Sequence, residues 1–508
     1  MSVLTVGRRG RPTTRLRTLS SVAVVRRPER SVHEDETNAS PAAPGRRSGR
    51  LVLLIALAAV LVLLGGAGTL LGRAGTSPSS QQDRSVAAPP PPTVTAPATP
   101  SPSATSTPGP GMPDPRRLAA ALQKPLRDPG LAGPAGMQVA DLATGRVLFD
   151  QDSAKPDVPA STAKLLTATV ALERLGPQTR LRTRVLAAGD VLYLVGAGDP
   201  TLTRTGPPTD GRVAGAAPAR VDDLARQIRA AGIGRASAVV SDTSLFAGPA
   251  AARGWRPYYF DAEVAPVSAL AVDGGRAGSS VKPLPRTGDP ARAARDALRS
   301  SLADAGVAVP DSRSGRVPAG AREVAVVDSP PVADLVRRML TYSDNDLAEA
   351  LGRLVAVAGG HPADFAGSVA GLTDGLRQLG LPVDGLRLED ASGLSHDDRI
   401  PPALLVQVLR TAADPAHPEL RAVLDGLPVA GRTGTLDDRF GAADTEAGVD
   451  AVHAKSGRLA GVAALAGTVR TREGRTLVFS VRAPSVDLTV GEVALDRIAS
   501  TLARCGCR

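Results

Sequence analysis

Aromatic residues make up only 2% of this chain of 508 residues, and it contains a single tryptophan. Hydrophobic residues still account for 43% of the composition, so the core must be built from small aliphatic side chains, chiefly alanine, valine and leucine. This composition argues against a chain that is disordered over its whole length. The length is enough for two or three folded units, and nothing forces oligomerisation for stability.

Cysteine and histidine are scarce as well. Only Cys505 and Cys507 occur, in "RCGCR", which excludes a disulfide framework. A bridge across one intervening residue is strained, so their pairing is open, and neither fits a catalytic role. The histidines are scattered: His33, His361, His396, His417 and His453. The chain has no HExxH, no GxSxG and no phosphate-binding GK[ST] loop, and we expect no metal and no cofactor.

Positive charge is concentrated at the N-terminus. Residues 1–50 carry eleven arginines against four acidic residues, which is most of the net charge of +10. The charge therefore belongs to a tail rather than to a folded face, and we expect no nucleic-acid partner.

A run without a charged residue follows this tail: "LVLLIALAAVLVLLGGAGTLLG", residues 51–72. As a helix it spans about 33 Å, enough for a bilayer core. By the positive-inside rule the tail is cytoplasmic, and the bulk of the chain lies on the cell-wall side. We predict a single-pass membrane anchor; the alternative is a cleaved signal peptide, for which the leader is long.

The remaining chain divides by composition. Residues 73–115 are rich in proline, serine and threonine and are typical of an extended linker. We expect one domain formed by residues 116–180 and 331–508, with a subdomain inserted at 181–330.

Local patterns give the expected elements of that domain. "GMQVADLATGRVLFDQD" alternates around Ala143-Thr144-Gly145 and predicts a β-hairpin. "PASTAKLLTATVALERLG" predicts a helix that ends at Gly176. Two helices flank "YSDND", and three successive strands, of which the first begins at "AVHAKSG", precede a final helix. An antiparallel sheet closed by helices is the expected core.

One of only five lysines, Lys164, lies three residues after Ser161. Arginine cannot give up its proton in a protein, whereas a desolvated lysine can lose it and act as a base. One helical turn therefore brings an amine to a hydroxyl, which can activate a serine nucleophile without histidine. Taken alone, the pair is better explained as a capping serine and a solvated lysine.

Two further triplets change that balance. Ser343-Asp344-Asn345 and Lys455-Ser456-Gly457 follow Ser161 and Lys164 in the order found in penicillin-binding proteins and serine β-lactamases. The chain resembles the D-alanyl-D-alanine carboxypeptidases/endopeptidases of the penicillin-binding protein 4 type. The similarity covers roughly residues 116–500, through segments such as "ASTAKLLTA", "EDASGLSHDDRI", "GRTGTLDDRF" and "HAKSGRLAGVAALAG".

This resemblance implies an α/β (α+β) fold of the transpeptidase/β-lactamase type, an antiparallel sheet flanked by helices with an inserted subdomain. It implies that Ser161 attacks the penultimate D-Ala of peptidoglycan stem peptides and that Lys164 takes its proton. Ser343 and Asn345 would relay protons and hold the substrate amide, and Lys455 would supply positive potential. Penicillins would acylate the same serine.

The resemblance also implies a substrate-binding edge made by Ser456, Gly457 and Arg458. The backbone N–H groups of Ser161 and Arg458 would hold the oxyanion, and Ser456 the terminal carboxylate. The family commonly has "KTGT" where this chain has "KSGR", so Arg458 either binds a carboxylate or points to solvent. We interpret the similar "GRTGT" as a structural turn in which Asp437 or Asp438 pairs with Arg439.

Two other functions are compatible with parts of this pattern. A serine β-lactamase needs a carboxylate base, typically in a Glu-x-x-x-Asn element after the second triplet, and none is found. A membrane-tethered peptidoglycan-binding protein without activity is disfavoured because all five candidate catalytic residues are intact. The balance of carboxypeptidase and endopeptidase action stays open.

Overall fold

The computed structural model describes residues 111–206, 215–276, 285–485 and 487–507. The predicted tail, the predicted anchor at 51–72 and nearly all of the predicted linker lie outside these residues. Within the described ranges, no helix is both long and apolar enough to cross a membrane.

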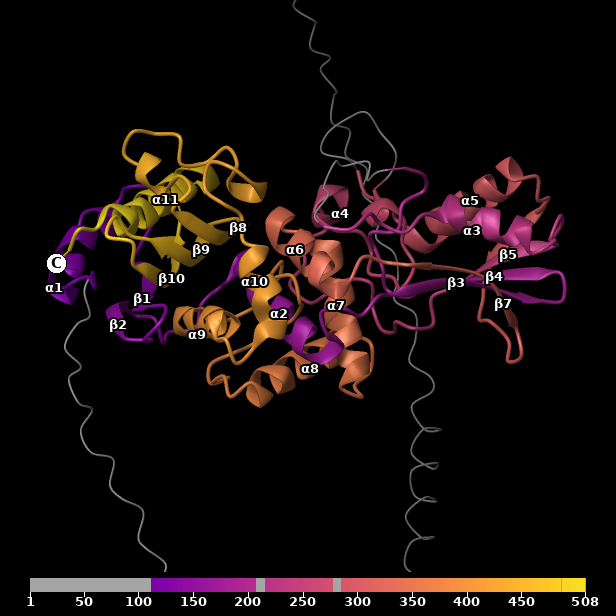
Figure 1. Ribbon diagram of the computed structural model, residues 1–508, viewed down its shortest axis with the longest axis horizontal. Helices are drawn as coiled ribbons and strands as arrows, with labels where there is room; N and C mark the ends of the chain where they lie inside the picture. Colours follow the sequence, from indigo (N-terminus) through magenta and orange to yellow (C-terminus); the bar gives the residue numbers. More distant parts are fainter. Residues whose placement is uncertain (1–110, 207–214, 277–284, 486, 508) are drawn as a thin grey trace, which may run out of the picture. The chain divides into compact units, whose positions relative to one another are not determined.

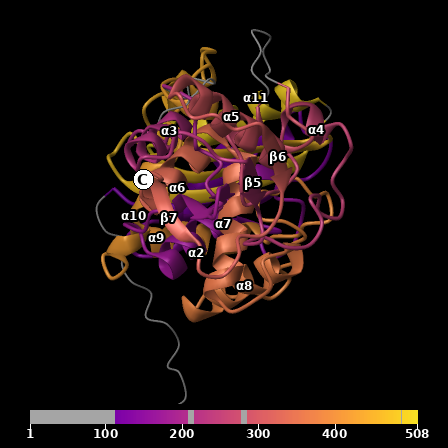
Figure 2. The same ribbon diagram turned by 90° about the vertical axis from the view of Figure 1, so that its right-hand side faces the viewer.

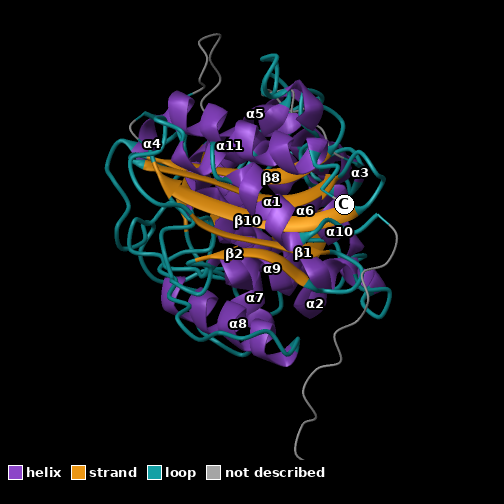
Figure 3. Ribbon diagram, turned by 90° about the vertical axis from the view of Figure 1, so that its left-hand side faces the viewer, coloured by secondary structure: helices purple, strands orange, loops and turns teal. Residues whose placement is uncertain are grey.

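One sheet joins the two ends of the described chain. Its strands run antiparallel in the order β2-β1-β10-β9-β8. They are β1 (Gly136–Asp141), β2 (Val147–Gln151), β8 (Val452–Leu459), β9 (Val462–Arg470) and β10 (Thr476–Pro484). β1 pairs with β10, from Gly136 opposite Arg482 to Asp141 opposite Leu477. The N-terminal hairpin thus completes a sheet made otherwise by C-terminal strands (Figure 3).

The turn between β1 and β2 forms where the sequence predicts it. Asp141 accepts hydrogen bonds from the backbone N–H and the hydroxyl of Thr144, at 2.8 and 2.7 Å. Gly145 has a φ of 74°, which glycine adopts without steric cost. Arg475, which precedes β10, pairs with the same carboxylate. The hairpin is therefore tied to its neighbouring strand by charge as well as by backbone pairing.

Helices cover both faces of this sheet (Figures 1 and 3). On one face α11 (Leu488–Arg504) packs on β9 and contacts α1 (Pro115–Leu122). On the other, α9 (Pro402–Ala413) packs on β1 and β10 and contacts α2 (Lys164–Leu175). Each face has its own hydrophobic core. Further helices complete the second core: α6 (Val332–Tyr342), α7 (Asn345–Ala358), α8 (Phe365–Gln378) and α10 (Arg421–Asp425).

A second, mixed sheet is formed by the intervening chain, in the order β6-β5-β4-β3-β7. Its strands are β3 (Arg182–Ala188), β4 (Val191–Val195), β5 (Ala238–Asp242), β6 (Asp311–Ser314) and β7 (Arg322–Asp328). β4, β5 and β6 are parallel, and the other pairs are antiparallel. Helices α3 (Val221–Ala230) and α5 (Pro290–Asp304) pack against this sheet and each other (Figure 2). The expected mixed α/β architecture is confirmed, whereas the domain boundaries given above stay predictions.

Helix α2 is buried along most of its length. Every residue from Lys164 to Leu172 is buried, and the helix contacts α6, α7, α8 and α9. It ends at Gly176, whose φ is 82°, as predicted. Because Lys164 begins this helix among apolar neighbours, its amine must find hydrogen-bond partners inside the protein.

Truncation of Leu172 to alanine tests the central role of α2. Leu172 is fully buried, so Leu172→Ala should lower the free energy of unfolding by about 3 kcal/mol through lost burial and a residual cavity. The measurement is urea unfolding followed by circular dichroism. Val357→Ala is the control, because Val357 on α7 is 44% exposed and should change stability by no more than about 0.5 kcal/mol. Equal effects of the two substitutions would contradict the prediction.

Candidate active site

Ser161 lies in a strained turn directly before α2. It belongs to the 3-10 helix η2 (Ala160–Ala163), and the preceding Ala160 has a φ of 48°, a left-handed conformation that costs a non-glycine residue about 1 kcal/mol or more. Two glycines approach the turn closely. A side chain at Gly457 would come within 2.9 Å of the Pro159 carbonyl oxygen, and one at Gly393 would collide with the Ala160 carbonyl. The turn is therefore held between β8 and the segment around residue 393.

Lys164 is wholly buried, and its Nζ has three hydrogen-bond partners. They are Ser161 Oγ at 3.0 Å, Asn345 Oδ1 at 2.6 Å and the Ser392 carbonyl oxygen at 2.7 Å. A carbonyl and an amide oxygen can only accept, whereas a hydroxyl can also donate. The ammonium can therefore donate to all three partners, and the neutral amine can keep its two N–H groups on Asn345 and Ser392 and accept from the Ser161 hydroxyl.

The electrostatics of the site agree with this pattern. Burial lowers the pKa of Lys164 from its ordinary value to about 8. The negative charges of Asp390, Glu349, Asp344 and Glu263 oppose the shift, in that order. At pH 7 roughly one tenth of the amine is therefore unprotonated, and this share grows as the pH rises through 8, which no arginine at this position would permit.

The predicted break between two helices supplies Ser343 and Asn345. Ser343 ends α6 with a φ of 56°, and the side chain of Asp344 caps α7 by accepting from the N–H of Leu347. Asn345 Nδ2 donates to the Glu263 carbonyl at 2.9 Å, which fixes Oδ1 towards Lys164. Ser343 lines the same cavity as Ser161, although its hydroxyl makes no hydrogen bond within the described ranges.

Strand β8 contains Lys455-Ser456-Gly457 and packs against η2. Lys455 is fully buried and donates to the Ser456 carbonyl at 2.6 Å. Burial, and next the charge of Lys164, lower the pKa of Lys455 well below its ordinary value. The Ser456 hydroxyl is 2.8 Å from Thr435 Oγ1. Thr435, in "GRTGT", is therefore a cavity residue that the sequence analysis missed.

The predicted pairing of Arg439 is wrong. Arg439 binds Asp496 Oδ1 and, at 3.2 Å, Glu492 Oε1, both on α11, rather than Asp437 or Asp438. The reason is tertiary: the arginine side chain is only 9% exposed and needs carboxylates inside the fold. The side chain of Arg458 differs, because it is 66% exposed and lies 3.7 Å from Glu492 Oε2.

These residues surround a cavity of about 1380 Å³. Of the predicted site residues, its lining includes Ser161, Ser343, Asn345, Ser456 and Arg458. Lys164, Lys455 and Gly457 are not part of the lining. The geometry thus exposes a serine hydroxyl to a large cavity while the amine that contacts it is shielded.

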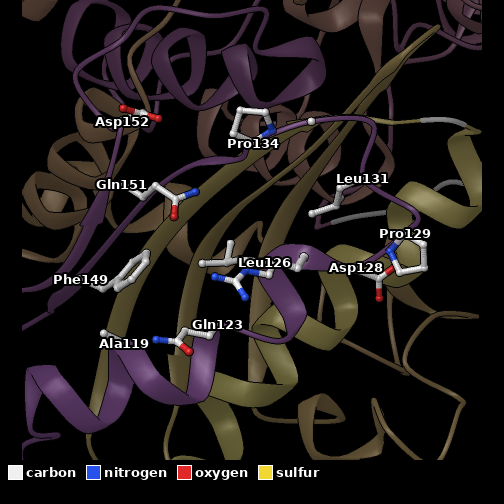
Figure 4. Close-up of a pocket in the computed structure, with 12 residues that line it drawn as sticks. Ala119, Gln123, Leu126, Asp128, Pro129, Leu131, Pro134, Phe149, Gln151 and Asp152 are labelled. Atoms are coloured by element: carbon white, nitrogen blue, oxygen red, sulfur yellow. The ribbon is translucent and has the colours of Figure 1, made fainter.

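A separate cavity of about 640 Å³ contains none of the predicted residues. It lies beside the first sheet, where Gln123, directly after α1, and Phe149 and Gln151 of β2 line it (Figure 4). Within the described ranges, no three His, Cys, Asp or Glu side chains are placed to hold a metal ion.

The sequence analysis missed the residues behind Lys164. Asp390 and Glu349 are buried, and both contact the segment that presents Ser392. "EDASGLSHDDRI" was part of the resemblance, but no role was given to its acids. The only available signal was an aspartate before small residues, which is typical of a turn.

Comparison with known proteins identifies the class. Residues 118–293 and 284–504 match the D-Ala-D-Ala carboxypeptidase 3 (S13) family. The chain belongs to this family and is a D-Ala-D-Ala carboxypeptidase, as the resemblance implied.

Individual relatives cover most of the chain. A carboxypeptidase of Mycobacterium tuberculosis is 39% identical over 78% of this chain and 85% of its own. Carboxypeptidase DacB of Mycolicibacterium smegmatis is 38% identical over 91% and 98%. The crystal structure of penicillin binding protein 4 from Haemophilus influenzae has a TM-score of 0.62 at 22% identity, covering 75% of this chain and 97% of that one. This likeness confirms the fold.

The lowered pKa of Lys164 can be measured directly. With only five lysines, a chain labelled with [ε-¹³C]lysine gives few signals. The signal that disappears in Lys164→Met should titrate with a pKa of about 8. Because the ordinary lysine pKa is about 10.4, a titration near that value would contradict the burial of the amine. Lys155→Met is the control and should leave the Lys164 titration unchanged.

Proposed function

We propose that Ser161 is the nucleophile of this carboxypeptidase and forms an acyl-enzyme with peptidoglycan stem peptides. The observation that carries the proposal is the contact between Ser161 Oγ and the buried Nζ of Lys164 at 3.0 Å. The serine faces a cavity large enough for a peptide end, and the amine is one whose pKa burial has lowered.

In the first step the neutral amine of Lys164 accepts the hydroxyl proton while Oγ bonds to the carbonyl carbon of the penultimate D-Ala. Asn345 and Ser392 keep the two N–H groups of the amine occupied, so its lone pair is directed at the serine. Collapse of the tetrahedral intermediate breaks the peptide bond. The leaving amine takes a proton that originates on Lys164, with Ser343 as the relay.

Substrate binding is assigned to the β8 edge of the cavity. The hydroxyl pair of Ser456 and Thr435 can donate to the terminal carboxylate, and exposed Arg458 supplies positive charge beside it. In its protonated form Lys455 raises the local potential without contacting substrate, and because burial lowers its pKa, this contribution weakens as the pH rises. Water then attacks the acyl-enzyme and regenerates Ser161. A penicillin acylates the same oxygen, and its ring opens in place of peptide cleavage.

Substitution of Ser161 tests this assignment. Ser161→Ala in the full-length chain should abolish covalent labelling by a fluorescent penicillin and lower D-Ala release from a pentapeptide by at least about 1000-fold, because the bonding atom is gone. Lys164→Arg should also fail, since arginine keeps the charge but is no base. Ser300→Ala, on the exposed side of α5, is the control. Labelling that persists in Ser161→Ala would show that another nucleophile is used.

We also propose that residues 51–72 anchor the enzyme in the cell membrane, with the catalytic part on the cell-wall side. The support is the charge-free run of 22 residues after an arginine-rich tail. The full-length chain should stay with the membrane fraction through carbonate extraction, and the chain lacking residues 51–72 should not. A mature protein whose N-terminus lies after this run would instead establish a cleaved leader.

A further inference from the structure

The carbonyl of Ser392 is one of the two groups that can only accept from Lys164. Unlike Asn345, it is a backbone atom of a loop, so its position depends on what holds that loop. Glu349 of α7 accepts the N–H of Ala391 with both oxygens, at 3.2 and 3.3 Å, and Thr167 of α2 donates to the Ala391 carbonyl at 2.6 Å. The residue before Ser392 is thus fixed from two helices.

Asp390 fixes the rest of the loop. One carboxylate oxygen accepts from the N–H groups of Ser392 and Gly393, at 3.1 and 2.6 Å. The other accepts from the N–H of Ser395 at 2.8 Å and from Nε1 of Trp255 at 2.7 Å. Asp390 is fully buried. Every one of these four bonds has the aspartate as acceptor, which is the pattern of an ionised carboxylate.

Trp255 lies in the segment that follows β5 and leads to the cavity-lining residues. Its ring packs against Phe260 and Phe365, with ring centroids 5.9 and 5.6 Å apart. Two residues earlier, the backbone carbonyl of Arg253 accepts a hydrogen bond from the Ser395 hydroxyl of the loop at 2.8 Å. Further along, this chain includes the cavity residues Tyr259 and Glu263. The segment that lines the cavity therefore also makes hydrogen bonds to the loop at residues 390–395, which presents the Ser392 carbonyl to Lys164.

We propose that Trp255 and Asp390 are positioning residues for the activation of Ser161, because their hydrogen bond holds the Ser392 carbonyl on Lys164. This inference rests on the proposed roles of Ser161 and Lys164. It assigns to the sole tryptophan of the chain an action through Asp390 and the loop rather than through contact with substrate.

Loss of the indole N–H should change the pKa of Lys164 in a predictable direction. When the loop loosens, the Ser392 carbonyl moves away from Lys164 Nζ. The loss of this acceptor destabilises the protonated amine more than the neutral amine. The pKa of Lys164 then falls further, while the lone pair is less well aimed at Ser161. The titratable groups that face Lys164 are Asp390 on the loop, Asp344 before α7, Glu263 beside the cavity, Glu349 on α7 and Lys455 on β8. Burial raises the pKa of Glu349 to about 8 and lowers the pKa of Lys455. All of them are retained when only Trp255 is changed.

The test is the rate of acylation of the full-length chain by a fluorescent penicillin as a function of pH. Trp255→Phe keeps an aromatic ring and removes the N–H. Its acylation rate constant on the plateau should be about tenfold lower, the worth of a hydrogen bond to a charged group, and the rise with pH should begin at lower pH than in the natural chain. Replacement of Trp255 by benzothienylalanine, in which sulfur takes the place of the N–H, should give the same two changes with indole shape preserved.

Phe260→Leu is the matched control, since it removes a ring that packs on Trp255 but leaves the hydrogen bond to Asp390. It should retain the natural rate and pH profile. The final extent of labelling gives the folded fraction, so rates are compared per competent site. A natural profile in both tryptophan variants overturns the positioning role, and so does an equal loss in Phe260→Leu. If Ser161→Ala is still labelled, it is the nucleophile assignment that fails.

Discussion

The site depends on one constraint, which is that a buried amine must be surrounded by partners that suit its neutral form. Lys164 meets two atoms that can only accept and one hydroxyl that can also donate. A third pure acceptor in place of the hydroxyl would favour the ammonium and disable the proposed base, whereas a missing acceptor would leave an N–H unpaired in an apolar interior. The number and kind of partners therefore matter more than their distance alone.

Meeting this constraint requires parts of the chain that are far apart in sequence. The helix break between α6 and α7 supplies Asn345, and its neighbour Asp346 is paired with Arg286 at 2.7 Å and accepts from the N–H of Ala265 at 2.8 Å. Buried Arg353 on the same helix donates to the carbonyls of Ala247 and Ala363, at 2.6 and 2.8 Å. The chain between Lys164 and Ser343 is thus docked on α7 and supports the groups that face Lys164.

The sequence was sufficient for those features that depend on local pattern or on residue type. The hairpin at Thr144, the helix after Ser161 and the break at Ser343 all form as predicted, because turn residues and helical periodicity act over a few positions. The partners of Asp390 and Arg439 were not predictable. Trp255 lies 135 positions from Asp390. Arg439 pairs with Asp496 rather than with the adjacent aspartates, because its side chain is buried and needs a carboxylate inside the fold. Thr435 was missed since its contact with Ser456 exists only once β8 is in place.

At the β8 edge of the cavity, Arg439 and Arg458 both contact carboxylates of α11, but the two arginines differ in exposure. Glu492 and Asp496 hold Arg439 with its side chain only 9% exposed, and a guanidinium engaged by two carboxylates has no free donors to spare for a substrate without breaking buried pairs. Arg458 is 66% exposed and has only the 3.7 Å contact with Glu492 Oε2, a weak surface interaction. Of the two arginines beside Ser456, Arg458 is therefore the one able to turn towards a carboxylate. The departure from the family's usual "KTGT" thus adds an exposed cation at the edge while the hydroxyl of the triplet is kept.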